Sequence, residues 1–161
     1  MMDIRHLPNR VTIREFPLKL DLGCGQYKLN GYHGMDWADY GQEIKWDATQ
    51  GIPLPDSSVC DLYTSHFLEH LNWEQFYFVM AEILRVCQNG AKLTIRVPHG
   101  DTIEGHLTCH YIRITEDTLK GIERNWTPWE QWSQSEKHSN FEITSIRREE
   151  YHLIGEFIVR K

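Results

Sequence analysis

Short apolar segments alternate with polar, glycine-containing segments along the first hundred residues. Apolar residues at alternate positions, or in short runs bounded by turn formers, are typical of strands. Strands are therefore predicted at residues 18–22, 32–37, 43–47, 59–66 and 92–97. Helical or irregular segments separate them, and this order is typical of a mostly parallel sheet with crossover connections.

One stretch has the spacing of an amphipathic helix. Its apolar residues recur three or four positions apart, at Phe76, Val79, Met80, Ile83, Leu84 and Cys87. Asn72 is a suitable N-cap, with Gln75 at the capping-box offset. Gly90 is expected to end this helix. A shorter helix is expected after Thr115, where two acidic residues would favour the positive end of the helix dipole.

The pattern closes with two more strands, at 141–148 and 153–160. The turn between them leaves no room for a helix, so this pair must be antiparallel. The chain contains no repeat or linker, and its 161 residues suffice for one core. We therefore predict a single α/β domain whose last strand is antiparallel.

The first strand runs into a glycine turn, LDLGCG, and an aspartate ends each of the next two strands. Ligands of such sheets bind beyond the carboxyl ends of the strands. Gly23 and Gly25 would let the backbone approach a ligand closely. Asp36 could accept hydrogen bonds from ribose hydroxyls, and Asp47 from the amine of a purine. Asp36 follows Gly25 much sooner than the roughly 20 residues typical of the dinucleotide fingerprint.

Taken together, several segments resemble the class I S-adenosylmethionine-dependent methyltransferases: LDLGCG, GMDW, WDATQGIPLPDSSVCDLYTSHFLEHL and ILRVCQNGAKLTIRVP. The resemblance covers roughly residues 18–98 and is nearest to a compact, type 11-like branch with a shortened first crossover. It implies a Rossmann-like three-layer sandwich with a seven-stranded or slightly smaller sheet. Within the single domain, it implies an N-terminal segment (1–17), a cofactor-binding core (18–98), an acceptor or lid region (99–140) and terminal antiparallel strands (141–161).

The resemblance implies S-adenosylmethionine as cofactor and S-adenosylhomocysteine as product. The residues that would contact the cofactor are Asp21, Gly23, Cys24, Gly25, Asp36, Trp37, Asp47, Ala48, Ser65 and His66. Asp21 and the glycines would lie at the methionine end, Asp36 at the ribose, and Asp47 with Ala48 at the adenine. We expect Cys24 to serve as a small residue of the turn rather than as a nucleophile.

The segment between the glycine turn and the second strand is unusually short. Only residues 26–31 separate them, so the usual first helix is missing or one turn long. The N-terminal amides of that helix normally help to bind the cofactor. We therefore expect an open methionine pocket, completed by residues 1–17 or by a second subunit in a homodimer.

Methyl transfer from a sulfonium mainly requires alignment of the acceptor. A general base is needed only when the acceptor is a hydroxyl or an ammonium. The candidates are histidines near the ends of the fourth and fifth strands: His66, His70, His99, His106 and His110. His66 is the best placed, but the sequence alone does not select among them.

Two other patterns involve metal ligands. His66 to His70 spells HxxEH, an inverted zinc-protease motif, but it straddles a strand end rather than lying on a helix. His99, His106, Cys109 and His110 are also potential ligands, in a spacing that fits no zinc finger. We therefore predict no metal site, and a zinc hydrolase stays a remote alternative.

The composition limits the partners. The chain has 17 basic and 23 acidic residues, a net charge of −6, which argues against bulk nucleic-acid binding. It has no apolar run long enough for a membrane span, and its four cysteines form no CxxC, which indicates free thiols in a reducing, cytoplasmic compartment.

The acceptor is the least defined element. The absence of an NPPY-type signature counts against the methylation of DNA bases or of glutamine. A small molecule, a saccharide, a side chain of a protein partner or another acceptor all stay open, and a small molecule or a saccharide is favoured because only residues 99–140 remain for acceptor recognition. Trp126, Trp129 and Trp132 could stack on such a ligand, or pack a lid or a subunit contact. An inactive cofactor-binding module, or a subunit of a larger complex, is the alternative.

Overall fold

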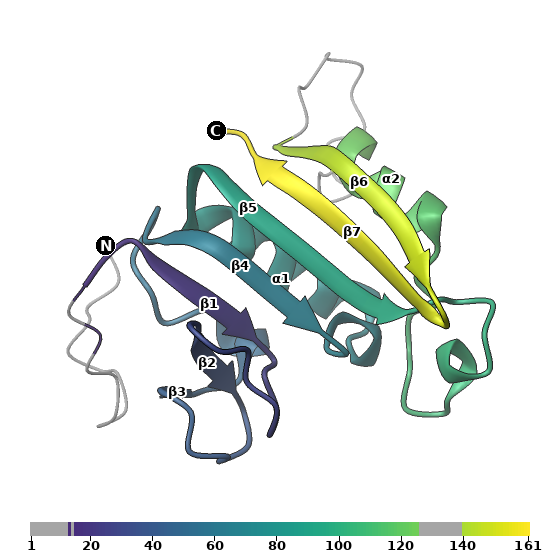
Figure 1. Ribbon diagram of the computed structural model, residues 1–161, viewed down its shortest axis with the longest axis horizontal. Coiled ribbons are helices and arrows are strands. Elements are labelled where there is room, and N and C mark those ends of the chain that lie inside the picture. Colours follow the sequence, from purple (N-terminus) through teal and green to yellow (C-terminus); the bar gives the residue numbers. More distant parts are fainter. Residues whose placement is uncertain (1–12, 14, 126–139) are drawn as a thin grey trace.

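A computed structural model of the chain describes residues 13, 15–125 and 140–161. Seven strands form one sheet in the order β3-β2-β1-β4-β5-β7-β6 (Figure 1). The strands are β1 (Leu18–Leu22), β2 (His33–Asp36), β3 (Ile44–Lys45), β4 (Val59–Ser65), β5 (Cys87–Pro98), β6 (Phe141–Glu149) and β7 (His152–Val159). The first five pair in parallel, whereas β7 is antiparallel to both of its neighbours. The predicted sheet is confirmed.

Two α-helices pack behind this sheet in the view of Figure 1, α1 (Trp73–Val86) and α2 (Glu116–Asn125). The predicted capping box begins α1: the Asn72 side chain accepts a hydrogen bond from the Gln75 amide, and the Gln75 side chain accepts one from the Asn72 amide. The helix buries one stripe of side chains against the sheet, formed by Phe76, Val79, Met80, Ile83 and Val86. Among the described residues, no helix is long and apolar enough to cross a membrane.

The end of α1 differs from the prediction. The helix stops at Val86, and β5 begins at Cys87, not at residue 92. Cys87 pairs with Val59 of β4, whereas the next pair joins Lys92 to Asp61, so residues of β5 bulge out between the two pairs. Gly90 takes a φ of 81° in this bulge. Its left-handed conformation therefore serves a β-bulge rather than the end of a helix.

The connection from β1 to β2 contains no helix, as the shortened first crossover predicts. The Asp21 side chain, which is 2% exposed, accepts a hydrogen bond of 2.7 Å from the Leu29 amide. Burial raises the pKa of this carboxyl group, although the Leu29 amide and the nearby Lys28 oppose the shift. Asp21 therefore fixes the short loop that replaces the helix.

The two faces of the sheet differ sharply in polarity. The face toward the helices is apolar, and its central row consists of Leu20, Leu62, Leu93 and Phe157. The opposite face carries ion pairs between neighbouring strands, Lys19 with Asp61 at 3.7 Å and Lys92 with Glu156 at 3.8 Å. No α-helix of the described residues covers this second face (Figure 1). Within this part of the chain, helices therefore form only one of the two outer layers of a three-layer sandwich.

Candidate functional site

A cavity of about 560 Å³ lies at the carboxyl ends of β1, β2 and β4. This is the edge at which parallel sheets bind their ligands, and the volume falls in the range typical of small-molecule sites. The cavity is lined by Gly23, Gly25, Asp36, Trp37, Tyr40, Asp47, Thr49, His66, Phe67, His70, Leu71 and Gln75. A recess of about 30 Å³ adjoins it beside Trp46 and Ala48, with room for about one water molecule.

The glycine turn forms one wall of this cavity. Gly23 and Gly25 have φ angles of 70° and 53°, in the region that favours glycine. A Cβ atom on Gly23 would lie 2.6 Å from the side chain of Phe67, whereas one on Gly25 would meet nothing within 4 Å. The turn is therefore closely packed at its first glycine and open at its second.

Two carboxylates stand beside the turn, each oriented by backbone amides. Asp36 accepts hydrogen bonds from the amides of Gly25 at 2.9 Å and Ala38 at 3.0 Å. Asp47 accepts from the amide of Thr49 at 2.9 Å and from its hydroxyl at 2.7 Å. An ionised carboxylate has about four acceptor positions, so each keeps acceptors for a ligand. Trp37 lies next to Asp36 with 74% of its surface exposed.

Four of the residues expected at the cofactor do not line this cavity, and one of them, Ala48, lies in the adjoining recess. Asp21 is engaged with the loop amide of Leu29. The side chain of Ser65 instead accepts a hydrogen bond of 3.4 Å from Arg96. Cys24 is 8% exposed, and burial raises the pKa of its thiol to about 12. Since a thiolate is the reactive form of cysteine, Cys24 is unsuited to nucleophilic catalysis.

His66 directly follows β4 and belongs to a chain of polar side chains. Its Nε2 lies 2.9 Å from Nε2 of His152, whose Nδ1 lies 2.9 Å from Nη2 of Arg96. Because a guanidinium only donates, Nδ1 of His152 must accept and its Nε2 must donate to His66. The proton of a neutral His66 is then on Nδ1, 3.5 Å from the buried carboxylate of Glu69.

The electrostatics favour the neutral form of His152. The pKa of His152 is lowered, first by burial and then by the positive charge of Arg96 and by His66. Neither Glu69 oxygen has a hydrogen-bond partner among the described residues. This carboxylate is therefore free to offset a positive charge on His66.

The other candidate histidines lie in different environments. His70 lines the cavity, and the ring of His110 packs against it with centroids 4.7 Å apart. His106 is exposed and bonds the carbonyl of Thr102 at 2.9 Å. His99 is 1% exposed and lies 2.8 Å from Glu116. Of the candidate bases, His66 and His70 are thus the two that reach the cavity.

Sequence reasoning missed Arg96 and His152, because they approach His66 from β5 and β7 through the sheet. The pattern HxxEH does not gather its two histidines, since Glu69 faces His66 while Nδ1 of His70 bonds the Cys109 carbonyl. The described geometry therefore does not favour a zinc-protease site. The predicted stacking residues Trp126, Trp129 and Trp132 lie outside the described residues.

Comparison with known proteins gives a match at the level of structure. No model of a protein family matches the sequence, and neither does any curated protein. Many solved structures match. A SAM-dependent methyltransferase from Methanosarcina mazei shares 16% identity over 92% of this chain and 94% of its own, with a TM-score of 0.66.

Two further solved structures show what this fold accommodates. The 1,6-didemethyltoxoflavin-N1-methyltransferase of Burkholderia thailandensis, with bound 1,6-didemethyltoxoflavin and S-adenosylhomocysteine, is 13% identical over 89% of this chain and 71% of its own, with a TM-score of 0.65. The cyclase SpnF is 14% identical over 94% of this chain and 77% of its own, with a TM-score of 0.64. At these identities the likeness establishes a shared fold and nothing finer.

Proposed function

We propose that this chain, which has the fold of the class I S-adenosylmethionine-dependent methyltransferases, binds S-adenosylmethionine and methylates a small molecule or a saccharide. The cavity at the carboxyl edge of the sheet carries this proposal. It joins a glycine turn, two oriented carboxylates and a histidine within one space of about 560 Å³. The open space above Gly25 and the exposed ring of Trp37 fit a ligand of this kind.

Different residues of the cavity would bind different parts of the cofactor. Asp36 would accept hydrogen bonds from the ribose hydroxyls, and Asp47 would bind the adenine amine, with Trp37 packing on the base. The methionine end would lie over the turn at Gly25. The charge of Asp36, which is half-buried, favours a positively charged sulfonium, because opposite charges attract more strongly in a partly desolvated site.

The bound cofactor supplies a methyl group that is already activated on sulfur. The task of the chain is then to align the acceptor, a contribution of roughly 7–11 kcal/mol in well-oriented reactions. Where the acceptor is a hydroxyl or an ammonium, His66 is our candidate for the proton acceptor, with its Nε2 giving up the hydrogen bond from His152 in order to take the proton. His152 positions its ring, and Glu69 would offset the charge that it gains.

Calorimetric titration with S-adenosylhomocysteine tests the binding step. Wild-type protein should bind it, and Asp36→Asn should weaken binding by roughly tenfold or more, because a hydrogen bond to a charged group contributes about 1.5–3 kcal/mol. Asp117→Asn is the matched control, since this aspartate of α2 is exposed and, within the described part of the chain, forms an ion pair with Lys120 at 3.6 Å. Thermal unfolding checks that Asp36→Asn still folds, because Asp36 also bonds Gly25 and Ala38.

Two outcomes would count against this function. Absence of binding to the wild type, or equal binding to a folded Asp36→Asn variant, would remove the cofactor site from this cavity. Binding without S-adenosylhomocysteine formation, across a panel of small-molecule and saccharide acceptors, would favour an inactive cofactor-binding module or a subunit of a larger complex.

A further inference from the structure

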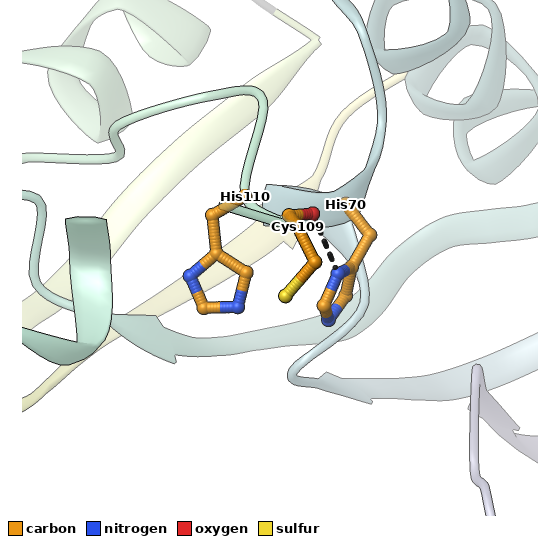
Figure 2. A group of neighbouring side chains, drawn as sticks. All are labelled: His70, Cys109 and His110. Atoms are coloured by element: carbon orange, nitrogen blue, oxygen red, sulfur yellow. Dashed lines mark hydrogen bonds between the residues drawn. The ribbon is translucent and has the colours of Figure 1, made fainter. Parts of the chain in front are cut away.

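Three side chains with metal-binding atoms meet beside the cavity. They are His70, which ends the 3₁₀ helix η3 (Leu68–His70), and Cys109 with His110, from the loop after η4 (Glu104–His106). Their ligand atoms all lie within 4.8 Å of one another. Figure 2 shows the thiol of Cys109 between the two imidazole rings, which are nearly perpendicular at 78°.

Backbone hydrogen bonds hold the two segments together. The carbonyl oxygen of Glu69 accepts hydrogen bonds from the amides of Tyr111 at 2.8 Å and Ile112 at 3.3 Å. Within the loop, the His110 amide donates to the Leu107 carbonyl at 2.9 Å. The residues on either side of the cluster are thus fixed by the fold, so the three side chains are brought together before any ligand binds.

The proton positions leave the ligand atoms available. Nδ1 of His70 lies 3.0 Å from the carbonyl oxygen of Cys109. A carbonyl only accepts, so Nδ1 carries the proton and Nε2 keeps a free lone pair. Metal-binding histidines almost always donate their other ring N–H in this manner. Nδ1 of His110 is buried without a hydrogen-bond partner among the described residues, so no hydrogen bond at this atom holds the ring in its present orientation.

We propose that His70, Cys109 and His110 bind a divalent transition-metal ion, with zinc as the best match. Two imidazoles and a thiolate are donors that zinc prefers. Tetrahedral zinc brings its ligand atoms to roughly 3.3–3.8 Å from one another. The side chains therefore have to close by about 1 Å, and the exposed side chains of His70 and Cys109 have space to move.

Three protein ligands leave one coordination position open, which is the pattern of catalytic rather than structural zinc sites. Because His70 also lines the cavity, this position adjoins the space in which we place the cofactor, where an acceptor would have to meet it. An acceptor hydroxyl bound to the metal would lose its proton more readily. This consequence rests on the proposed function, whereas the metal site does not.

The test uses the full chain, stripped of metal by a chelator. Titration with Zn²⁺ against a chromophoric chelator should give one ion per chain, and Co²⁺ should give a thiolate charge-transfer absorption. Cys109→Ser should abolish that absorption and weaken Zn²⁺ binding by at least about tenfold, and His110→Gln should weaken binding similarly. His106→Gln is the matched control, because His106 is an exposed histidine of the same segment that bonds Thr102 instead.

The absence of stoichiometric Zn²⁺ binding would overturn the proposal, and so would a Cys109→Ser variant that binds Zn²⁺ as tightly as the wild type. Cys109 is exposed, so this variant should fold, which circular dichroism verifies. Titration of the metal-free chain with S-adenosylhomocysteine separates the two proposals. Retained binding there, with no Zn²⁺ binding, would reject the metal site alone, and the reverse result would reject the proposed function alone.

Discussion

Replacing Gly23 by alanine tests how closely the turn packs beneath the cavity. The new Cβ would lie 2.6 Å from both Cβ and Cγ of Phe67, whereas carbon atoms in good contact are about 3.5–4.0 Å apart. The backbone would also keep a φ of 70°, which disfavours an L-residue by roughly 1–2 kcal/mol. Overpacking adds about 1–3 kcal/mol. The expected loss in the free energy of unfolding is therefore about 2–5 kcal/mol.

Gly25→Ala separates the two contributions. Gly25 has a φ of 53°, but an added Cβ would meet nothing within 4 Å. This variant should lose only the backbone contribution, roughly 1–2 kcal/mol. Its methyl group would project into open space where we place the methionine end of the cofactor. It should therefore bind S-adenosylhomocysteine more weakly while remaining the more stable of the two variants.

Urea unfolding at constant pH measures both variants, with m-values compared to confirm a common unfolded state. The double variant Gly23→Ala/Phe67→Ala completes the cycle. Removing the ring should restore part of the lost stability, beyond the sum of the single effects. Equal destabilisation by Gly23→Ala and Gly25→Ala would refute the argument, and so would a double variant with strictly additive losses.

Two further predictions concern stability. Arg85 donates to the carbonyl of Ile52 at 2.7 Å and to both oxygens of Glu82 at 2.8 Å. Arg85→Met should therefore lower the free energy of unfolding, measured in urea, by about 2–4 kcal/mol. A loss below about 1 kcal/mol would contradict this prediction. The folded state lowers the pKa of His152, chiefly through burial. As pH falls, the unfolded chain therefore protonates this histidine before the folded chain does. The stability of the wild type should fall as the pH drops below about 6.5. Urea unfolding between about pH 7.5 and 5 should show a shallower fall for His152→Gln, and identical slopes would argue against a lowered pKa.

Local patterns predicted most of the fold because they report on burial and capping. The alternation around Leu20 defines β1, and the Asn72 capping box lies within one helical turn of the chain. The predicted end of α1 was wrong, because a glycine such as Gly90 is favoured both after the end of a helix and in a bulge. The pairing of Cys87 with Val59 decides between them, and this contact depends on distant residues.

The candidate site could likewise be predicted only in part from the sequence. Asp36 ends β2, as predicted, whereas Asp47 follows β3 by two residues and caps the short helix Ala48–Gln50; both lie near strand ends, so sequence reasoning could predict their positions. Asp21 also follows a strand pattern, but the short loop folds back and engages its carboxylate. The meeting of His70 with Cys109 could not be predicted, because it depends on backbone hydrogen bonds between separate segments.

The position of β7 has a consequence for the order of assembly. Although β7 follows β6 in the chain, it lies between β5 and β6 in the sheet. During translation, β1 to β5 can pair before residues 152–159 exist, but β6 has no strand partner until then. An intermediate of this kind exposes the edge of β5, a site for mispairing. Because His152 belongs to the inserted strand, its contact with His66 forms only when the sheet is complete.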